Sequence, residues 1–173
     1  MKPLIALLGL CLIHCALASP ETDAAKKQAQ QCADASVAKD YDKVIAFTHP
    51  ALIKVAGGKE ALRKALEAAI KQLAELGVSI EKTSIRSATE PKKVGSALVS
   101  LVTQEATVRT ADVQLTQESV LIAYSYDNGK NWVFADTTGM DKVMYEKLFP
   151  ELKNVIALPE KKEPRAGTEP LRQ

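Results

Sequence analysis

The chain has 173 residues, of which 46% are apolar and 25% are charged, and this is the composition of one ordinary folded domain and not of a disordered chain. Lysine and arginine number 23 against 21 acidic residues, so the formal net charge is only +2. A charge this close to zero gives no long-range attraction to nucleic acid or to anionic lipid. We interpret the isolated lysine pairs at 26–27, 92–93 and 161–162 as solvated surface, and we expect no nucleic-acid partner.

The first residues have the organisation of a cleavable export signal. Lys2 precedes an apolar run from Leu4 to Leu17, and the small residues Ala16 and Ala18 fit the rule for cleavage after Ala18. The run is shorter than the roughly 20 apolar residues of a membrane span. We therefore predict an exported protein, periplasmic or secreted, with no stable membrane insertion after cleavage. A retained N-terminal anchor and a lipoprotein are the alternatives.

Cysteine usage agrees with cleavage. Cys11 and Cys15 lie inside the predicted signal, and neither follows the small residue that lipidation requires. The mature chain would keep only Cys32, so it forms no internal disulfide and depends on its own apolar core. Because Cys32 lies among alanines on a predicted helix, we interpret it as a small buried hydrophobe in preference to a reactive thiol.

The first half of the mature chain is predicted to be helical. Residues from Thr22 to about Lys39 contain neither glycine nor proline and are rich in helix-forming side chains. A short helix follows from Asp40 to Phe47 and ends at His49, because the residue before a proline is disfavoured in helices. The strongest pattern runs from Lys59 to Leu76. Its apolar stripe, expected to pack on a sheet, consists of Leu62, Leu66, Ala69, Leu73 and Leu76.

After Gly77 the apolar spacing drops toward two and β-branched residues dominate, which predicts strands. The expected strands are Val78–Ser87, Val94–Thr110, Val113–Tyr126 and Asn131–Thr137. Asn128-Gly129 is typical of a tight hairpin turn. Because the two middle strands are long, they must twist and curl, and one face of the sheet becomes concave. A last helix is expected from Thr138 to Leu152.

This order of elements predicts an α+β fold. N-terminal helices pack on a curved, cone-like antiparallel sheet of about four strands, followed by a short C-terminal helix. The expected organisation is a signal peptide over 1–18, one domain over 19–158 and a tail over 159–173. The tail is rich in proline and charge and has one leucine, so we expect it to be mobile.

Three stretches of the chain resemble the nuclear-transport-factor-2-like family, the cone-shaped fold shared with ketosteroid isomerases and polyketide cyclases. They are DYDKVIAFTHP, the helix GGKEALRKALEAAIKQLAELGV, and the hairpin VLIAYSYDNGKNWVFADTTG followed by MDKVMYEKLFPEL. The resemblance rests on element order and covers roughly residues 22 to 158. That family includes isomerases, hydrolases, dehydratases, binding modules and subunit-joining domains, so it does not select one function.

A second resemblance is local. The stretch from Ser125 to Trp132 matches the S-x-D-x-G-x-x-W pattern of the Asp-box hairpin found in sialidase-type propellers. A propeller needs several copies, and this chain has one. We therefore expect a structural role, in which Ser125 and Asp127 bond the turn backbone and Trp132 folds back over the hairpin; glycoside binding is the alternative.

The sequence shows no catalytic constellation. The mature chain has one histidine and one cysteine, too few for a zinc site, and it lacks a nucleophile elbow and a phosphate-binding glycine loop, so we predict no metal and no cofactor. Acid–base chemistry by a buried aspartate, histidine or tyrosine stays open, as the resembled enzymes imply. The candidates for such chemistry are His49, Tyr124, Tyr126 and Asp136. The candidates for lining a pocket are Tyr41, His49, Tyr124, Trp132, Phe134 and Asp136, and no catalytic residue is assigned. For His49 the alternative is a turn residue, for Asp136 a local cap, and for the aromatic residues core packing.

Two functions follow as hypotheses, and a purely structural envelope protein is a third option that the sequence does not separate from the first. The first is a non-catalytic exported module that binds a small apolar molecule or a second copy of itself. Its basis is that a strand with apolar residues on both faces must be covered on both faces. Helices would cover one face of the sheet, and a ligand, the C-terminal segment or a partner subunit would cover the other. The alternative is a small lyase or isomerase that uses a buried aspartate or histidine in the cone. We favour the first.

Overall fold

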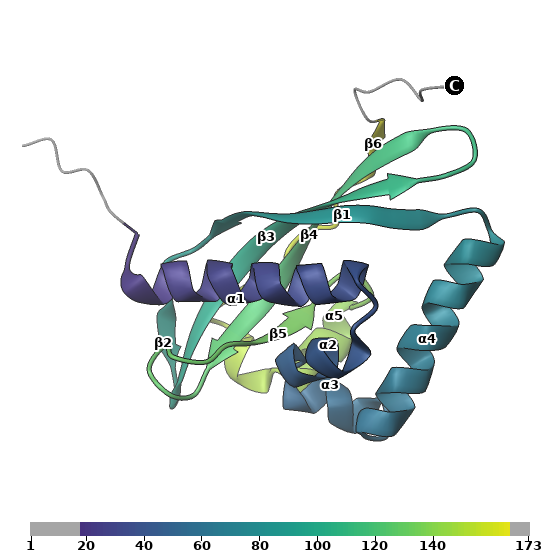
Figure 1. Ribbon diagram of the computed structural model, residues 1–173. Helices are drawn as coiled ribbons and strands as arrows, with labels where there is room; N and C mark the ends of the chain where they lie inside the picture. The colour runs from purple at the N-terminus through teal and green to yellow at the C-terminus, as the bar shows by residue number, and fades with distance from the viewer. Residues whose placement is uncertain (1–17, 167–173) are drawn as a thin grey trace, which may run out of the picture.

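The computed structural model describes residues 18–166, and Figure 1 shows helices gathered around one twisted sheet. The predicted signal peptide up to residue 17 and the tail from residue 167 lie outside the described residues. The helices are α1 (Pro20–Val37), α2 (Tyr41–Phe47), α3 (Pro50–Val55), α4 (Lys59–Glu75), α5 (Lys142–Leu148) and the 3-10 turn η1 (Pro150–Leu152). The strands are β1 (Ser79–Ala88), β2 (Lys92–Val94), β3 (Ala97–Arg109), β4 (Gln114–Ser125), β5 (Val133–Asp136) and β6 (Arg165–Ala166).

The sheet has the order β1-β3-β4-β5, with β2 paired to β3 and β6 paired to β4, and every one of these pairs is antiparallel. The α+β prediction, with N-terminal helices on an antiparallel sheet and a short C-terminal helix, is confirmed. The cone shape stays a prediction.

Three boundaries differ from the predicted ones, each for a local reason. The strand expected from residue 94 is divided into β2 and β3, because Gly95 takes a φ of +59° and forms a tight turn in which Val94 pairs with Ala97. Helix α3 was not predicted. Only two residues separate it from the end of α2, because Pro50 fits the first position of a helix. The last helix begins only at Lys142, where the Asp141 side chain accepts a hydrogen bond from the Met144 N–H.

Helix α1 begins at a well-defined cap. The Ser19 hydroxyl accepts a hydrogen bond from the Thr22 N–H, Pro20 occupies the first turn, and Glu21 and Asp23 place negative charge there. The buried side of the helix consists of small residues, among them Ala25 and Ala29, which are fully buried. Small side chains let the helix axis come close to the sheet. The same alanines explain why the helix buries little area per residue.

Two glutamines fix α1 to both edges of the sheet. The Gln28 amide donates to the Lys130 carbonyl (2.8 Å) and accepts from the Trp132 N–H (2.9 Å), beside β5. The Gln30 amide donates to the Thr83 carbonyl (2.9 Å) and accepts from the Ile85 N–H (2.9 Å), in β1. Residues two apart on a helix point about 200° apart. Groups at the two edges of the sheet therefore bond side chains on opposite sides of α1.

The two faces of the sheet are packed by different elements. On the α1 face the buried cluster consists of Ala25, Ala29, Val102, Leu121, Ala123, Trp132 and Phe134. On the opposite face α5 and η1 cover a cluster that consists of Val94, Ala97, Val99, Ile122, Tyr124, Ala135, Met140, Tyr145, Phe149 and Leu152. The sequence left three possibilities for covering the second face: a ligand, the C-terminal segment or a partner subunit. In the structure the C-terminal segment covers it.

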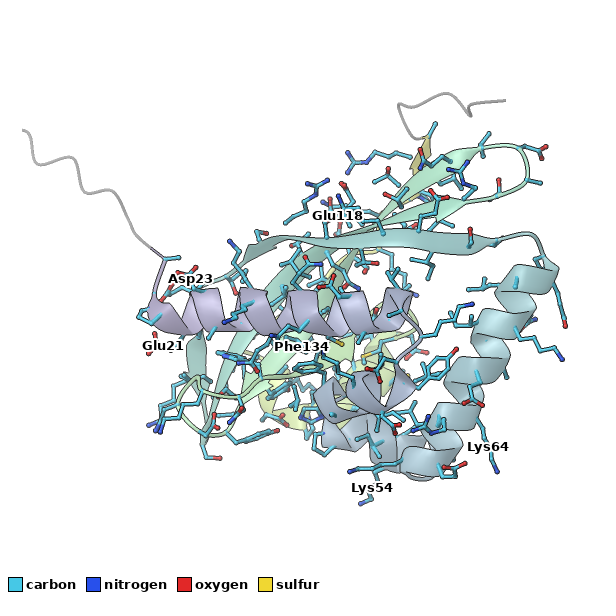
Figure 2. All side chains as sticks on the ribbon, viewed as in Figure 1. Glu21, Asp23, Lys54, Lys64, Glu118 and Phe134 are labelled. Atoms are coloured by element: carbon cyan, nitrogen blue, oxygen red, sulfur yellow. The ribbon has the colours of Figure 1, made fainter. Side chains whose placement is uncertain are left out.

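The first half of the predicted tail lies against the sheet, whereas its composition predicted a mobile segment. Strand β6 pairs with β4 at Leu115 and Thr116, and Lys162 and Arg165 form ion pairs with Glu118, which Figure 2 labels beside β4. This part of the tail is held by backbone pairing and ion pairs and buries little apolar surface. Its low apolar content therefore gave no indication that it would be ordered.

The close approach of α1 predicts the effect of enlarging Ala29. Ala29→Leu inserts three heavy atoms at a fully buried position between helix and sheet, and overpacking of this kind lowers the free energy of unfolding by about 1–3 kcal/mol. Lys27→Leu, on the exposed side of the same helix, is the control and should change it by less than ~0.5 kcal/mol. Urea unfolding measures both. Equal effects of the two substitutions would contradict the packing described.

Candidate functional site

Helix α4 leaves a cleft between itself and the sheet. No residue of α4 is buried, and Figure 1 shows the helix at the side of the molecule, running from α3 to β1 and standing apart from α1. The cleft has a volume of about 270 Å³. Its lining consists of Cys32, Ala33, Ser36, Val44, Phe47, Thr48, Leu52, Leu62, Leu66, Gln104, Leu121, Phe134 and Asp136.

The floor of the cleft is apolar and buried. Ala33, Leu121 and Phe134 are each about 95% buried, and Phe134 packs against Phe47 with the ring centroids 6.1 Å apart. Figure 2 shows Phe134 below α1 and beside α2. Leu62 and Leu66 of α4 form the outer wall and are half-buried. These side chains offer contact to an apolar molecule without any change in the floor.

Polar groups gather at one end of the cleft. Asp136, the last residue of β5, accepts a hydrogen bond at Oδ1 from the Thr138 N–H (2.7 Å), and its Oδ2 faces the Gln104 amide nitrogen at 3.4 Å. That amide also donates to the Ser119 hydroxyl (3.0 Å). Asp136 is exposed, so its carboxylate meets both water and the cleft. The end of the cleft thus presents hydrogen-bond acceptors.

Cys32 lines the cleft with a thiol that is protonated and therefore a poor nucleophile. Burial, with a smaller contribution from the nearby Asp136 carboxylate, raises the pKa of Cys32 to about 11. The side chain is therefore protonated near neutral pH, and thiolate chemistry is disfavoured. The interpretation of Cys32 as a partly buried small hydrophobe fits this environment.

A second hollow adjoins the cleft at Ser36, which lines both. It has a volume of about 140 Å³ and lies between the other half of α4, the end of α1 and the start of β1. Ile70, Leu73 and Ile80 are among its lining residues. Ligand sites commonly measure about 300–1,000 Å³, and the cleft alone lies just below that range.

The candidate residues named from the sequence are divided by the sheet. Phe134 and Asp136 line the cleft, whereas Trp132 is buried beneath the hairpin that precedes β5. His49 and Tyr124 belong to an aromatic cluster on the opposite face. Tyr41 begins α2 and is half-buried. The sequence thus identified two residues of the cleft, Phe134 and Asp136. It grouped them with His49 and Tyr124, which the structure places on the opposite face of the sheet.

His49 performs a structural role at the start of α3. Its Nδ1 accepts from the Ala51 N–H (3.2 Å), so in the neutral ring Nε2 carries the proton and donates to the Tyr126 hydroxyl (2.8 Å). The ring packs against Tyr124 and Phe149, with centroid distances of 4.5 and 5.2 Å. Burial lowers the pKa of His49, and the charge of Glu151 opposes this in part.

The Asp-box hairpin is held by its own side chains. Ser125 Oγ donates to Asp127 Oδ1 (2.9 Å) and accepts from the Gly129 N–H (2.8 Å), and the Trp132 indole donates to the Gly129 carbonyl (2.9 Å). Hydrogen bonds from Asn131 are the main cause that lowers the pKa of Asp127 to about 2. Gly129 has a φ of +84° and packs against Glu21 of α1, so a side chain there would clash. These contacts fit the structural role expected for the motif.

Sequence reasoning missed the α4 side of the cleft and Gln104. Leu62 and Leu66 were assigned to a stripe packed on the sheet, because periodicity identifies the apolar side of a helix but not how far it is covered. Gln104 lies two residues after the buried Val102 in β3, on the side of the strand that faces α1. A long polar residue on a buried strand face is the signal that would have identified it.

Within residues 18–166 no three histidine, cysteine, aspartate or glutamate side chains lie close enough together to hold a metal ion, and no described helix is long and apolar enough to cross a membrane. No family model, curated protein or solved structure matches the chain. The resemblance to the nuclear-transport-factor-2-like family therefore rests on element order, and no family is assigned.

The lowered pKa of His49 predicts a pH dependence of stability. As the pH falls below about 6.5, the unfolded chain takes up a proton at His49 before the folded chain does, so stability is lost. His49→Asn keeps a hydrogen-bond acceptor at the helix start and removes the titration. The stability advantage of the natural protein over this variant should shrink between pH 7.5 and pH 5, as measured by urea unfolding. An advantage that is constant over this range would show that His49 is not held neutral.

Proposed function

We propose that this chain is an exported, non-catalytic protein that binds a small apolar molecule in the cleft between α4 and the sheet. The observation that carries the proposal is the contrast between the two sheet faces. The face under α5 and η1 is covered by a buried cluster of aliphatic and aromatic side chains, whereas on the other face no residue of α4 is buried and its leucines line a cleft. Half-buried leucines opposite a buried apolar floor are suited to a ligand that completes the burial.

The isomerase alternative has less support. His49 lies across the sheet from the cleft, bonded to Ala51 and Tyr126. Asp136 is the one carboxylate among the lining residues, and Cys32 beside it is protonated. General acid–base catalysis on a bound molecule needs a proton donor and a proton acceptor placed together, and Asp136 alone supplies one of them. A second copy of the chain is not needed to cover the sheet, since the C-terminal segment covers the second face.

Filling the cleft should abolish ligand uptake. The fluorescence of N-phenyl-1-naphthylamine rises when this apolar probe leaves water, so a titration reports its binding. Leu66→Trp places a large ring in the cleft and should weaken binding at least tenfold, whereas Ala68→Trp, an exposed position of the same helix, should leave it within about twofold. Far-ultraviolet circular dichroism checks that both variants fold. Unchanged binding by a folded Leu66→Trp variant would exclude the cleft as the site.

Export predicts a defined mature N-terminus. Cleavage after Ala18 leaves Ser19, the residue that caps α1, in place, so the folded domain would keep its first helix intact. Expression of the full chain in a bacterium, followed by intact-mass analysis of the secreted or periplasmic fraction, should give a chain that starts at Ser19. Ala18→Arg should block cleavage and leave the precursor with the membranes. A precursor that stays in the cytoplasm with an intact N-terminus would refute export.

A further inference from the structure

We propose that the ligand of the cleft is a cationic amphiphile, whose apolar chain lies on the Leu121 and Phe134 floor and whose ammonium group pairs with the Asp136 carboxylate. This inference rests on the proposed function, and it adds the chemical class of the ligand.

The charge of the cleft is the first observation. Among the residues that line it, Asp136 is the only charged one, and lysine and arginine are absent from that lining. A ligand that carries a carboxylate or phosphate would find no cation in the lining and would approach a negative charge. A ligand that carries an ammonium group would find its counter-ion at the mouth of an apolar cleft.

The second observation is the spare hydrogen-bonding capacity of Asp136. Thr138 orients the carboxylate through Oδ1, and the contact of Oδ2 with Gln104 is long, at 3.4 Å. None of the ion pairs found among residues 18–166 includes Asp136. An ionised carboxylate has about four acceptor positions and can donate none. The group is thus held in place with acceptor positions open to a donor from the ligand.

The position of the charge is the third observation. Asp136 is exposed, so pairing with a ligand does not require the burial of an isolated charge, which is the cost that makes interior ion pairs unfavourable. Phe134, two residues earlier on the same strand face, is buried on the floor. One strand therefore offers a contact for the apolar chain and a contact for the head group on the same side of the sheet.

Three probes with the same ten-carbon chain separate these contributions. Decylamine, decanol and decanoate, each below its micelle concentration, compete with N-phenyl-1-naphthylamine for the purified protein. We expect decylamine to bind about tenfold more tightly than decanol, and decanoate to bind most weakly, because charge-assisted hydrogen bonds are the stronger ones. Raised salt should reduce the advantage of the amine.

Asp136→Asn keeps the size of the side chain and removes its charge. It should abolish the tenfold preference for decylamine while leaving decanol within about twofold, and Glu67→Gln, on the exposed side of α4, should preserve the preference. Equal affinities for the three probes, or an unchanged preference in a folded Asp136→Asn variant, would overturn the head-group assignment and leave the cleft as an apolar site. Failure of every probe to displace the dye would overturn both proposals.

Discussion

The position of α1 on the sheet is the constraint on which the rest of the structure depends. Gln28 and Gln30 each present a donor and an acceptor, as a neighbouring strand would, and bond backbone groups at opposite edges of the sheet. Between them Ala29 is fully buried against the sheet. These contacts fix both the distance of the helix from the sheet and its position across the sheet. The Gln30 side chain also covers part of the unpaired backbone of the edge strand β1.

The cleft follows from that arrangement. Because α1 is narrow on its buried side and lies close to the sheet, Leu121, Phe134 and Asp136 line a cleft whose other side is formed by α2 and α4. Helix α4 contacts α2 and α3 in preference to the sheet, so its leucines cannot complete the core. On the other face the large side chains of Tyr145, Phe149 and Leu152 are buried against the sheet. One sheet thus has a closed face that supplies stability and a partly open face that is available for binding.

The sequence indicated the elements well and their spatial relations less well. The Leu62–Leu66–Leu73 spacing identified α4, and the change to alternating apolar residues after Gly77 identified the sheet. The spacing could not show that α4 stands away from the sheet, because that depends on its tertiary contacts with α2 and α3. Nor could the sequence show that His49 and Asp136 lie on different sides of the sheet. Tertiary packing decides toward which face a turn residue such as His49 points. The roles of Gln28 and Gln30 were invisible for a similar reason, because their partners lie 53 to 104 residues away in the chain.

The central claim is that the open face, and not the closed one, accepts an apolar molecule. Titration of N-phenyl-1-naphthylamine into protein with carbon-13-labelled leucine methyl groups tests it residue by residue. We expect the methyl signals of Leu62, Leu66 and Leu121 to shift in proportion to occupancy, while that of Leu152, buried on the closed face, stays unchanged. Shifts centred on Leu152, or no shift at any leucine of the cleft at saturating dye, would contradict the account.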